Sequence, residues 1–151
     1  MTRGSLSLVA AAALAAAVLT MWRVNGTSGM VVADTAVIAL GQELYDENCA
    51  SCHGANLQGQ PDWKIPLENG RYPAPPHDET GHTWHHADAL LEQIIRDGSA
   101  AVVGNGYESD MPGFGEVLGD DQISAILAYI KSTWPERERA IQARVTRDRT
   151  L

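Results

Sequence analysis

The most informative stretch of this sequence is Cys49-Ala50-Ser51-Cys52-His53. Its two cysteines are the only ones among 151 residues, so the chain is not a scaffold held together by many disulfides. Two thiols spaced three residues apart fall on one turn of a helix, and a histidine follows directly. This spacing indicates redox, metal or haem chemistry.

The pattern C-x-x-C-H is typical of covalent haem attachment. Both thiols would add to the vinyl groups of the haem, and His53 would bind the iron from the same side. A thioredoxin-like motif would need a βαβ context, and a structural zinc site would need a second pair of ligands. A plain disulfide stays open as an alternative. We therefore predict one haem c, held covalently by Cys49 and Cys52, with His53 as an iron ligand.

Upstream of the motif, apolar residues recur at helical spacing from Val37 to Tyr45. The predicted helix continues into Cys49. Gly41 lies in the middle of it, where glycine costs about 1 kcal/mol relative to alanine. A close approach by another backbone would explain a glycine at this position.

Downstream, the chain reads as helices joined by two long loops, without the alternation of a strand. The proline-rich first loop and the glycine-rich second one are unusual for a bare domain and suit a bulky cofactor. The sequence thus predicts an all-α fold. Its expected elements are a loop over 54–81, a helix from about His86 to Asp97, a loop over 98–119, a helix capped by Asp120 and broken at Trp134-Pro135, and a last helix over 136–147.

A second iron ligand is expected from Met111, the one methionine that follows the motif. It lies between Asp110 and Pro112, in the loop before the third helix. Methionine opposite histidine is a common ligand pair for electron-transfer haem. A methionine that only fills a gap in the core is the alternative, but a position beside proline and glycine argues against it.

These residues resemble a class I (monohaem) c-type cytochrome of the small bacterial, membrane-attached or periplasmic kind. The resemblance covers about residues 36–134 and includes the final helix with its Tyr129. It implies the cytochrome c fold, with three to five short helices wrapped around one haem, and one-electron transfer. It also implies that Gly41 packs against Tyr129. In this family a proline carbonyl orients the proximal histidine, and Pro61 is the positional candidate.

A histidine cluster follows the proline-rich loop: His77, His82, His85 and His86. Such spacing could bind copper or zinc, or supply a rival axial ligand. Alternatively, the histidines cap the second helix, bond to the loop backbone and meet the haem propionates. We favour the second interpretation because spacing alone does not show convergent geometry. By residue type, Trp63, Arg71 and Tyr72 are expected near the propionates.

Residues 1–26 read as a signal peptide or a transmembrane anchor, because Arg3 and Arg23 enclose an uncharged, mostly apolar run. The poor cleavage site that follows favours an uncleaved anchor in the inner membrane, although a cleaved, soluble periplasmic form is the alternative. A linker over 27–35, a cytochrome c domain over 36–134 and a C-terminal helical extension over 135–151 complete the expected organisation. The exported part would lie on the periplasmic side of the inner membrane.

The composition gives 19 acidic against 11 basic residues, a net charge of −8. Nucleic acid is therefore not an expected partner, because binding to phosphates needs clustered basic residues. An acidic protein suits a basic partner or simply stays soluble. The expected partners are redox proteins, one electron donor and one acceptor.

The function predicted from the sequence is that of a one-electron carrier between respiratory-type partners, with His53 and Met111 binding the iron. Since both axial positions are taken, no site is left for a substrate, and an enzyme is not expected. Three alternatives stay open: a haem-based sensor with a labile Met111, a copper- or zinc-handling protein that uses the His77–His86 cluster, and a fixed subunit of an oxidase or dehydrogenase.

Overall fold

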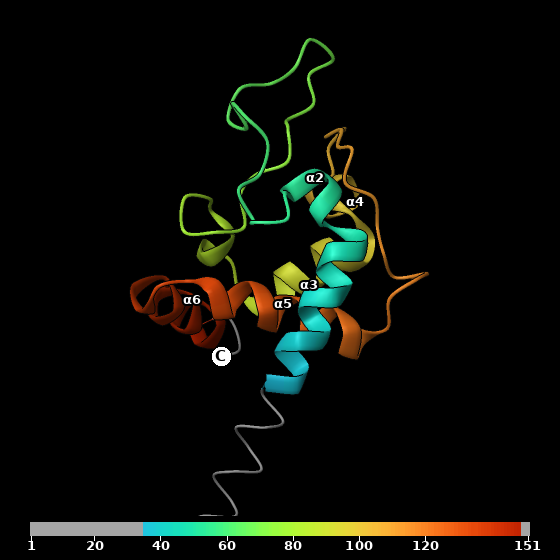
Figure 1. Ribbon diagram of the computed structural model, residues 1–151. Coiled ribbons are helices and arrows are strands. Elements are labelled where there is room, and N and C mark those ends of the chain that lie inside the picture. Colours follow the sequence, from blue (N-terminus) through green and yellow to red (C-terminus); the bar gives the residue numbers. More distant parts are fainter. Residues whose placement is uncertain (1–34, 149–151) are drawn as a thin grey trace, which may run out of the picture. The chain divides into compact units, whose positions relative to one another are not determined.

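The computed structural model describes residues 35–148, which form helices and loops and contain no β-strand (Figure 1). The chain divides into two units after Ala36, and every element below belongs to the second, apart from the first two residues of the first helix. This confirms the all-α expectation for the described residues. The elements are a helix over residues 35–48, α2 (Ala50–His53), the 3₁₀-helix η1 (Thr83–His85), α3 (Asp88–Asp97), α4 (Ser99–Val103), α5 (Asp120–Thr133) and α6 (Glu136–Asp148).

The signal or anchor expected over residues 1–26, and the linker after it up to residue 34, lie outside the described residues. Within residues 35–148, no helix is long and apolar enough to span a membrane.

The 35–48 helix crosses α5 at Gly41. A Cβ atom added at Gly41 would collide with the carbonyl of Ala125 and would lie 3.0 Å from the Cβ atom of Tyr129. The two helices can approach this closely only because residue 41 lacks a side chain. The expected contact between Gly41 and Tyr129 is thereby confirmed, and the cost of a glycine within a helix is explained.

The core lies between the 35–48 helix, α3 and α5, where aliphatic residues at helical spacing face each other. Trp134, at the end of α5, is also buried, and its indole nitrogen donates a 2.7 Å hydrogen bond to the carbonyl of His77. That bond ties the long loop to the core. The buried residues of this core include Leu44, Tyr45, Leu91, Ile95, Ile123, Ile126, Leu127, Ile130 and Trp134.

Two local predictions were wrong. Asp120 does not cap α5: it is the first helical residue, and the Gln122 side chain accepts a 3.0 Å bond from the backbone N–H of Gly119. Asp120 instead places negative charge in the first turn, where the helix dipole favours it. The segment 98–119 is not all loop, because it contains α4. This helix of five residues is too short to show a periodic pattern.

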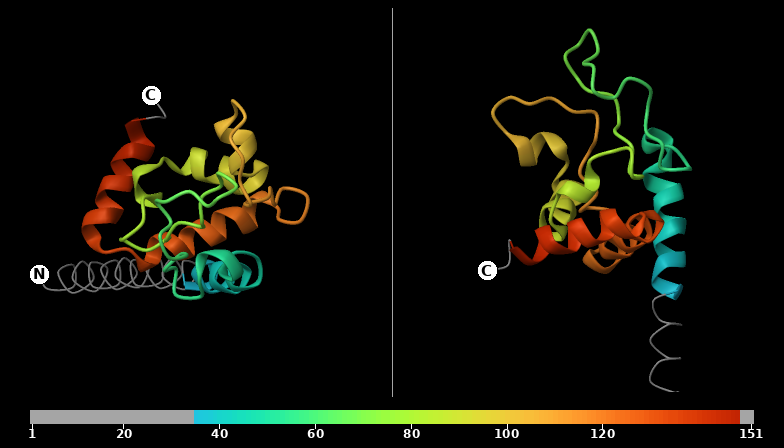
Figure 2. Two further views of the ribbon diagram at one scale, coloured as in Figure 1. Left: turned by 90° about the horizontal axis from the view of Figure 1, so that it is seen from above. Right: turned by 90° about the vertical axis from the view of Figure 1, so that its left-hand side faces the viewer.

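Helix α6 lies beside η1 (Figures 1 and 2). It buries two polar side chains, Glu138 and Gln142, whereas the sequence suggested a weak apolar pair. The amide of Gln142 donates to the carbonyl of His86 at 3.3 Å, and the hydroxyl of Thr146 accepts a 3.1 Å bond from the backbone N–H of Asp88. Helix α6 therefore holds the segment that leads into α3 mainly by hydrogen bonds.

Candidate cofactor site

The cysteine–histidine motif continues the 35–48 helix by one further turn. The backbone N–H of Cys49 donates to the carbonyl of Tyr45 at 2.8 Å, and that of His53 donates to the carbonyl of Cys49 at 2.9 Å. Cys49 is half-buried, Cys52 is exposed, and both are free thiols. Burial, with a smaller contribution from Cys52, raises the pKa of Cys49 to about 11. The helical turn therefore presents both thiols on one side, as covalent attachment requires.

His53 is buried, and its Nδ1 atom lies 2.8 Å from the carbonyl oxygen of Pro75. A carbonyl only accepts, so Nδ1 carries the proton and Nε2 is left as the nitrogen that can bind a metal. Burial lowers the pKa of His53, and the bond to Pro75 opposes this shift only in part. The ring is therefore neutral at pH 7, as a metal ligand must be.

The expectation that Pro61 orients His53 was wrong, because Pro75 makes this bond. Pro61 is exposed, and the loop to which it belongs extends away from the helices (Figure 1). The loop pairs with itself through a 2.9 Å bond from Gln60 N–H to the Ala74 carbonyl, and its backbone meets the His53 ring at Pro75. The first proline after the motif in sequence is thus not the one nearest in space.

A pocket of about 920 Å³ opens beside the motif. It lies near the upper end of ligand-site volumes and is mostly apolar, which suits a large planar cofactor. The residues present therefore fit a haem: two thiols at the edge, a neutral imidazole and an apolar interior. Aliphatic side chains from α3 and α5 line this interior: Leu90, Leu91, Ile94, Ile95, Ile126, Leu127 and Ile130.

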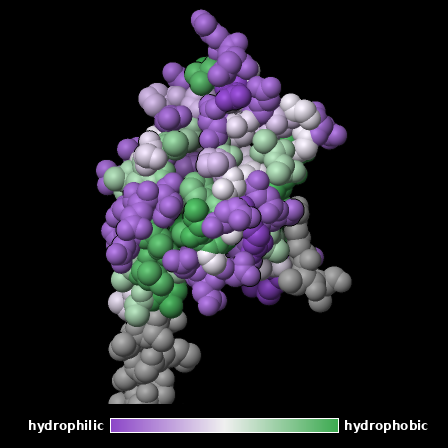
Figure 3. All heavy atoms as spheres, turned by 90° about the vertical axis from the view of Figure 1, so that its right-hand side faces the viewer, coloured by the Kyte–Doolittle hydropathy of each residue, from purple (hydrophilic) through white to green (hydrophobic). Residues whose placement is uncertain are grey.

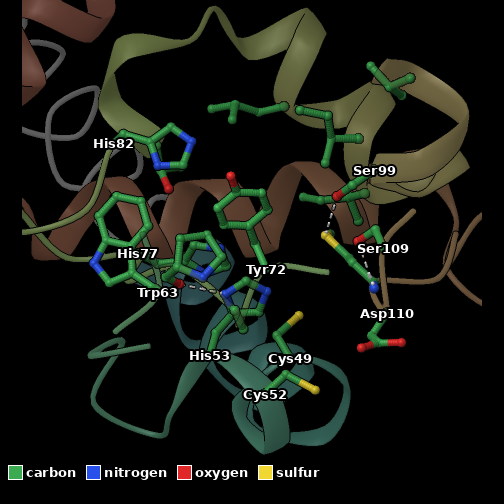
Figure 4. A pocket seen from close by; sticks show the side chains of 18 of the residues that line it. Cys49, Cys52, His53, Trp63, Tyr72, His77, His82, Ser99, Ser109 and Asp110 are labelled. Atoms are coloured by element: carbon green, nitrogen blue, oxygen red, sulfur yellow. Dashed lines mark hydrogen bonds between the residues drawn. The ribbon is translucent and has the colours of Figure 1, made fainter. Parts of the chain in front are cut away.

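Met111 lines the same pocket as His53, so the structure brings together the two residues expected to bind iron. Its sulfur accepts a 3.2 Å hydrogen bond from the hydroxyl of Ser99, and its backbone N–H donates to the hydroxyl of Ser109 at 3.1 Å. In Figure 4, Cys49, Cys52 and His53 lie on one side of the pocket, and Ser99 and Ser109 lie on another. Sequence reasoning missed both serines, because isolated serines in a glycine-rich loop carry no pattern.

The long loop contributes a third wall. Trp63 and Tyr72 line the pocket, as a role near propionates would need, and so does Lys64, which the sequence analysis did not single out. Arg71 does not line it. Its guanidinium is paired instead with Glu108, at 3.4 Å, and with Asp110. These exposed ion pairs connect the long loop to the segment that carries Met111.

Three histidines of the cluster lie against aromatic rings. His77 stacks on His53 with ring centroids 3.9 Å apart, His82 stacks on Trp63 at 5.3 Å, and the ring of His85 lies 3.7 Å from that of Trp84. In residues 35–148 no three His, Cys, Asp or Glu side chains are grouped so that they could hold a metal ion.

His77 is half-buried, and the Nδ1 side of its ring faces the protein interior. Its Nδ1 atom is buried and has no hydrogen-bond partner within residues 35–148. Burial lowers the pKa of His77 well below 6.5, and the neighbouring His53 and His82 lower it further. A neutral His77 ring therefore packs beside His53, as an apolar side chain would.

The comparisons with known proteins agree with this geometry. The family model for cytochrome c matches residues 38–134. Over 98 residues the chain is 37% identical to the cbb3-type cytochrome c oxidase subunit CcoP of Azospirillum brasilense, a match that covers 64% of this chain and 28% of that protein. The same subunit of Azospirillum sp. (strain B510) is 30% identical over 98 residues, covering 65% and 29%.

A shorter match of 39 residues, 51% identical, is to the cytochrome bc1 complex cytochrome c subunit of Mycobacterium tuberculosis (strain H37Rv), covering 24% of this chain and 14% of that protein. In each case the match spans less than a third of the relative's length. No solved structure matches the chain. The family model spans the motif, the pocket and α5, and so the chain belongs to the cytochrome c family, as a monohaem c-type cytochrome whose haem c is bound covalently through Cys49 and Cys52.

Proposed function

We propose that this cytochrome carries single electrons, with Nε2 of His53 and Sδ of Met111 as the two axial ligands of its iron. The observation that carries the proposal is the 2.8 Å contact between His53 Nδ1 and the Pro75 carbonyl, in a pocket that Met111 also lines. That bond selects the tautomer in which Nε2 can bind a metal. When bound, the haem supplies a one-electron couple between ferric and ferrous iron.

The chain's own residues prepare the pocket for this chemistry. Burial keeps His53 neutral, and the bond to Pro75 sets the orientation of its ring. The aliphatic side chains of α3 and α5 exclude water, and a methionine ligand raises the reduction potential. With both axial positions taken, no open position remains for a substrate. Transfer of electrons rather than catalysis follows from this arrangement.

Electron partners would dock at the mouth of the pocket. Four large hydrophobic side chains both line the pocket and are exposed, namely Leu67, Tyr72, Val103 and Tyr107. The face in Figure 3 is largely hydrophilic, with smaller hydrophobic areas. Redox encounters use small interfaces, and the net charge of −8 favours a basic partner whose affinity falls with added salt. The names of the relatives, an oxidase subunit and a bc1 complex subunit, support partners of the respiratory kind.

Residues 1–26 would place the cytochrome domain, residues 36–134, at the periplasmic side of the inner membrane. The linker over 27–35 would leave it room to reach its partners, and residues 135–151 would form an extension. Support comes from the apolar run between Arg3 and Arg23 and from the need to attach haem after export.

The visible spectrum of the oxidised protein tests the ligand pair. We would mature the full chain in an exporting host that attaches haem, and compare it with Met111→Leu and with Val103→Leu, a conservative change at the pocket rim. We expect the weak long-wavelength band of methionine bound to ferric iron in the parent and in Val103→Leu. Met111→Leu should lose this band and keep its covalent haem.

A parent protein that holds haem but lacks this band would overturn the proposed ligation. Rapid binding of carbon monoxide by the reduced parent would then favour the sensor. One tightly bound extra copper or zinc ion would favour the metal-handling protein.

A further inference from the structure

The sulfur of Met111 accepts a hydrogen bond from a residue 12 positions earlier in the chain. The Oγ atom of Ser99 lies 3.2 Å from Sδ. A thioether has no proton to give, so the serine hydroxyl is the donor. Ser99 is half-buried and lines the pocket together with Met111. The hydroxyl is therefore placed at the atom that the proposed function assigns to iron.

Backbone contacts on both sides hold Ser99 in this place. Gly98 adopts φ +84°, and a Cβ atom added there would lie 2.8 Å from the backbone nitrogen of Gly113 and 3.1 Å from the carbonyl oxygen of Met111. A Cβ atom added at Gly113 would lie 2.7 Å from the carbonyl oxygen of Arg96. The turn that begins α4 is thus packed against the methionine segment without side chains between them. This packing fixes the main chain next to Ser99 close to the segment that carries Met111.

Two serines form hydrogen bonds with different atoms of Met111. Ser109 accepts a 3.1 Å bond from the Met111 backbone N–H and so sets the course of the main chain. The hydrogen bond of Ser99, in contrast, goes to the sulfur of the Met111 side chain. A change at Ser99 should therefore alter the sulfur while the backbone of the segment keeps its own bond.

We propose that Ser99 is a positioning residue that raises the reduction potential by donating its hydrogen bond to the sulfur of Met111. The inference rests on the proposed ligation by Met111. A sulfur that shares electron density with a hydroxyl donates less to iron. Ferric iron carries the larger charge and loses more from this weaker donation than ferrous iron does. The ferrous form is thereby favoured, and the bond also holds the sulfur in one orientation.

The test compares Ser99→Ala with Ser99→Thr, which keeps the hydroxyl, in the full-length protein with its haem attached. Ser132→Ala is the matched control, because Ser132 also makes one hydrogen bond, to the Tyr129 carbonyl, and does not line the pocket. We would measure the midpoint potential by spectroelectrochemical titration. The long-wavelength band reports on Met111, and the thermal midpoint reports on folding.

We expect Ser99→Ala to keep the band and to raise the ferric-to-ferrous ratio at a given ambient potential by roughly three- to tenfold. This corresponds to a potential lower by about 30–59 mV for one electron. Ser99→Thr and Ser132→Ala should stay at the parent's potential. If Ser99→Ala does not mature, Ser99→Cys provides a weaker donor of similar size, for which we expect a smaller decrease.

An unchanged potential in Ser99→Ala, with the band present, would overturn the proposal. Equal decreases in Ser99→Ala and Ser99→Thr would also overturn it, because the hydroxyl would then not be the cause. A potential of Ser99→Cys at or above that of the parent would also overturn the proposal. A parent that lacks the band shows a different failure, that of the ligation by Met111 itself.

Discussion

Two of the walls of the haem pocket, the one with the cysteine–histidine motif and the one with Met111, are built in different ways. The wall that carries Cys49, Cys52 and His53 is one nearly continuous helix, formed by consecutive residues. The wall that carries Met111 is assembled from the end of α3, the start of α4 and a loop, held by backbone bonds such as that from the Phe114 N–H to the Ile95 carbonyl, 2.9 Å. Covalent attachment therefore depends on local helix geometry, whereas the proposed ligation by Met111 depends on contacts between separate segments.

The difference predicts where the protein is most easily disturbed. Changes in the continuous helix should act on haem attachment or on global stability. Changes in the assembled wall should act first on the iron–sulfur contact, while the haem stays bound. Four variants separate these effects.

The largest effect is expected for the double variant Cys49→Ala, Cys52→Ala. It removes both thiols that bind the haem covalently, so no haem should remain with the chain after denaturation. A haem-stained denaturing gel and the intact mass measure this directly. Ser51→Ala, an exposed change between the two cysteines, should keep full attachment. Covalent haem in the double variant would contradict the assignment.

Gly41→Ala should have the next largest effect, on global stability. The added methyl group would collide with the backbone carbonyl of Ala125, which cannot rotate away as a side chain could. Overpacking of this kind costs ~1–3 kcal/mol, and a contact with backbone belongs to the upper end. Denaturant unfolding of the mature protein measures the loss. The neighbouring Gln42→Ala, at an exposed site, is the control, and equal stability of both variants would refute the prediction.

Gly98→Ala should disturb the assembled wall more than the fold. Gly98 has φ +84° and ψ 152°, a conformation that costs other residues about 1–3 kcal/mol, and its new methyl group would press on the Gly113 backbone. We expect a weaker long-wavelength band with covalent haem retained. Gly104→Ala is the matched control, because Gly104 also has a positive φ but open space around it. The same loss of the band in both variants would show that strain alone is responsible.

Arg71→Gln should have the smallest effect. The Arg71 guanidinium pairs with Glu108 and Asp110, next to Met111, but these groups are exposed and screened by salt. We expect added imidazole to displace the methionine at a concentration lower by at most about threefold, at low salt only. Arg96→Gln is the control: it removes an exposed ion pair with Asp120 and should leave the required imidazole concentration unchanged. A difference that persists at high salt would argue against an electrostatic connection.

Most of the helices were predictable, because their apolar residues repeat every three to four positions. The close helix packing at Gly41 was also predictable, because a nearby backbone explains a glycine in the middle of a helix. Other features could not be predicted. The loop beyond Pro61 pairs with itself and meets the His53 ring at Pro75, and no residue pattern encodes which of its prolines makes that contact. Helix α6 buries Glu138 and Gln142, which a search for apolar faces overlooks. Helix α4 has too few residues for a period to appear.

By itself, the sequence determined the haem attachment and predicted His53 as an iron ligand, because both depend on residues within one helical turn. It also singled out Met111, as the one methionine after the motif. Only the tertiary structure decided that Pro75 orients His53, that Arg71 pairs with carboxylates instead of lining the pocket, and that Ser99 contacts the sulfur. These contacts join residues 12 to 39 positions apart, and their formation depends on how the loops return to the core.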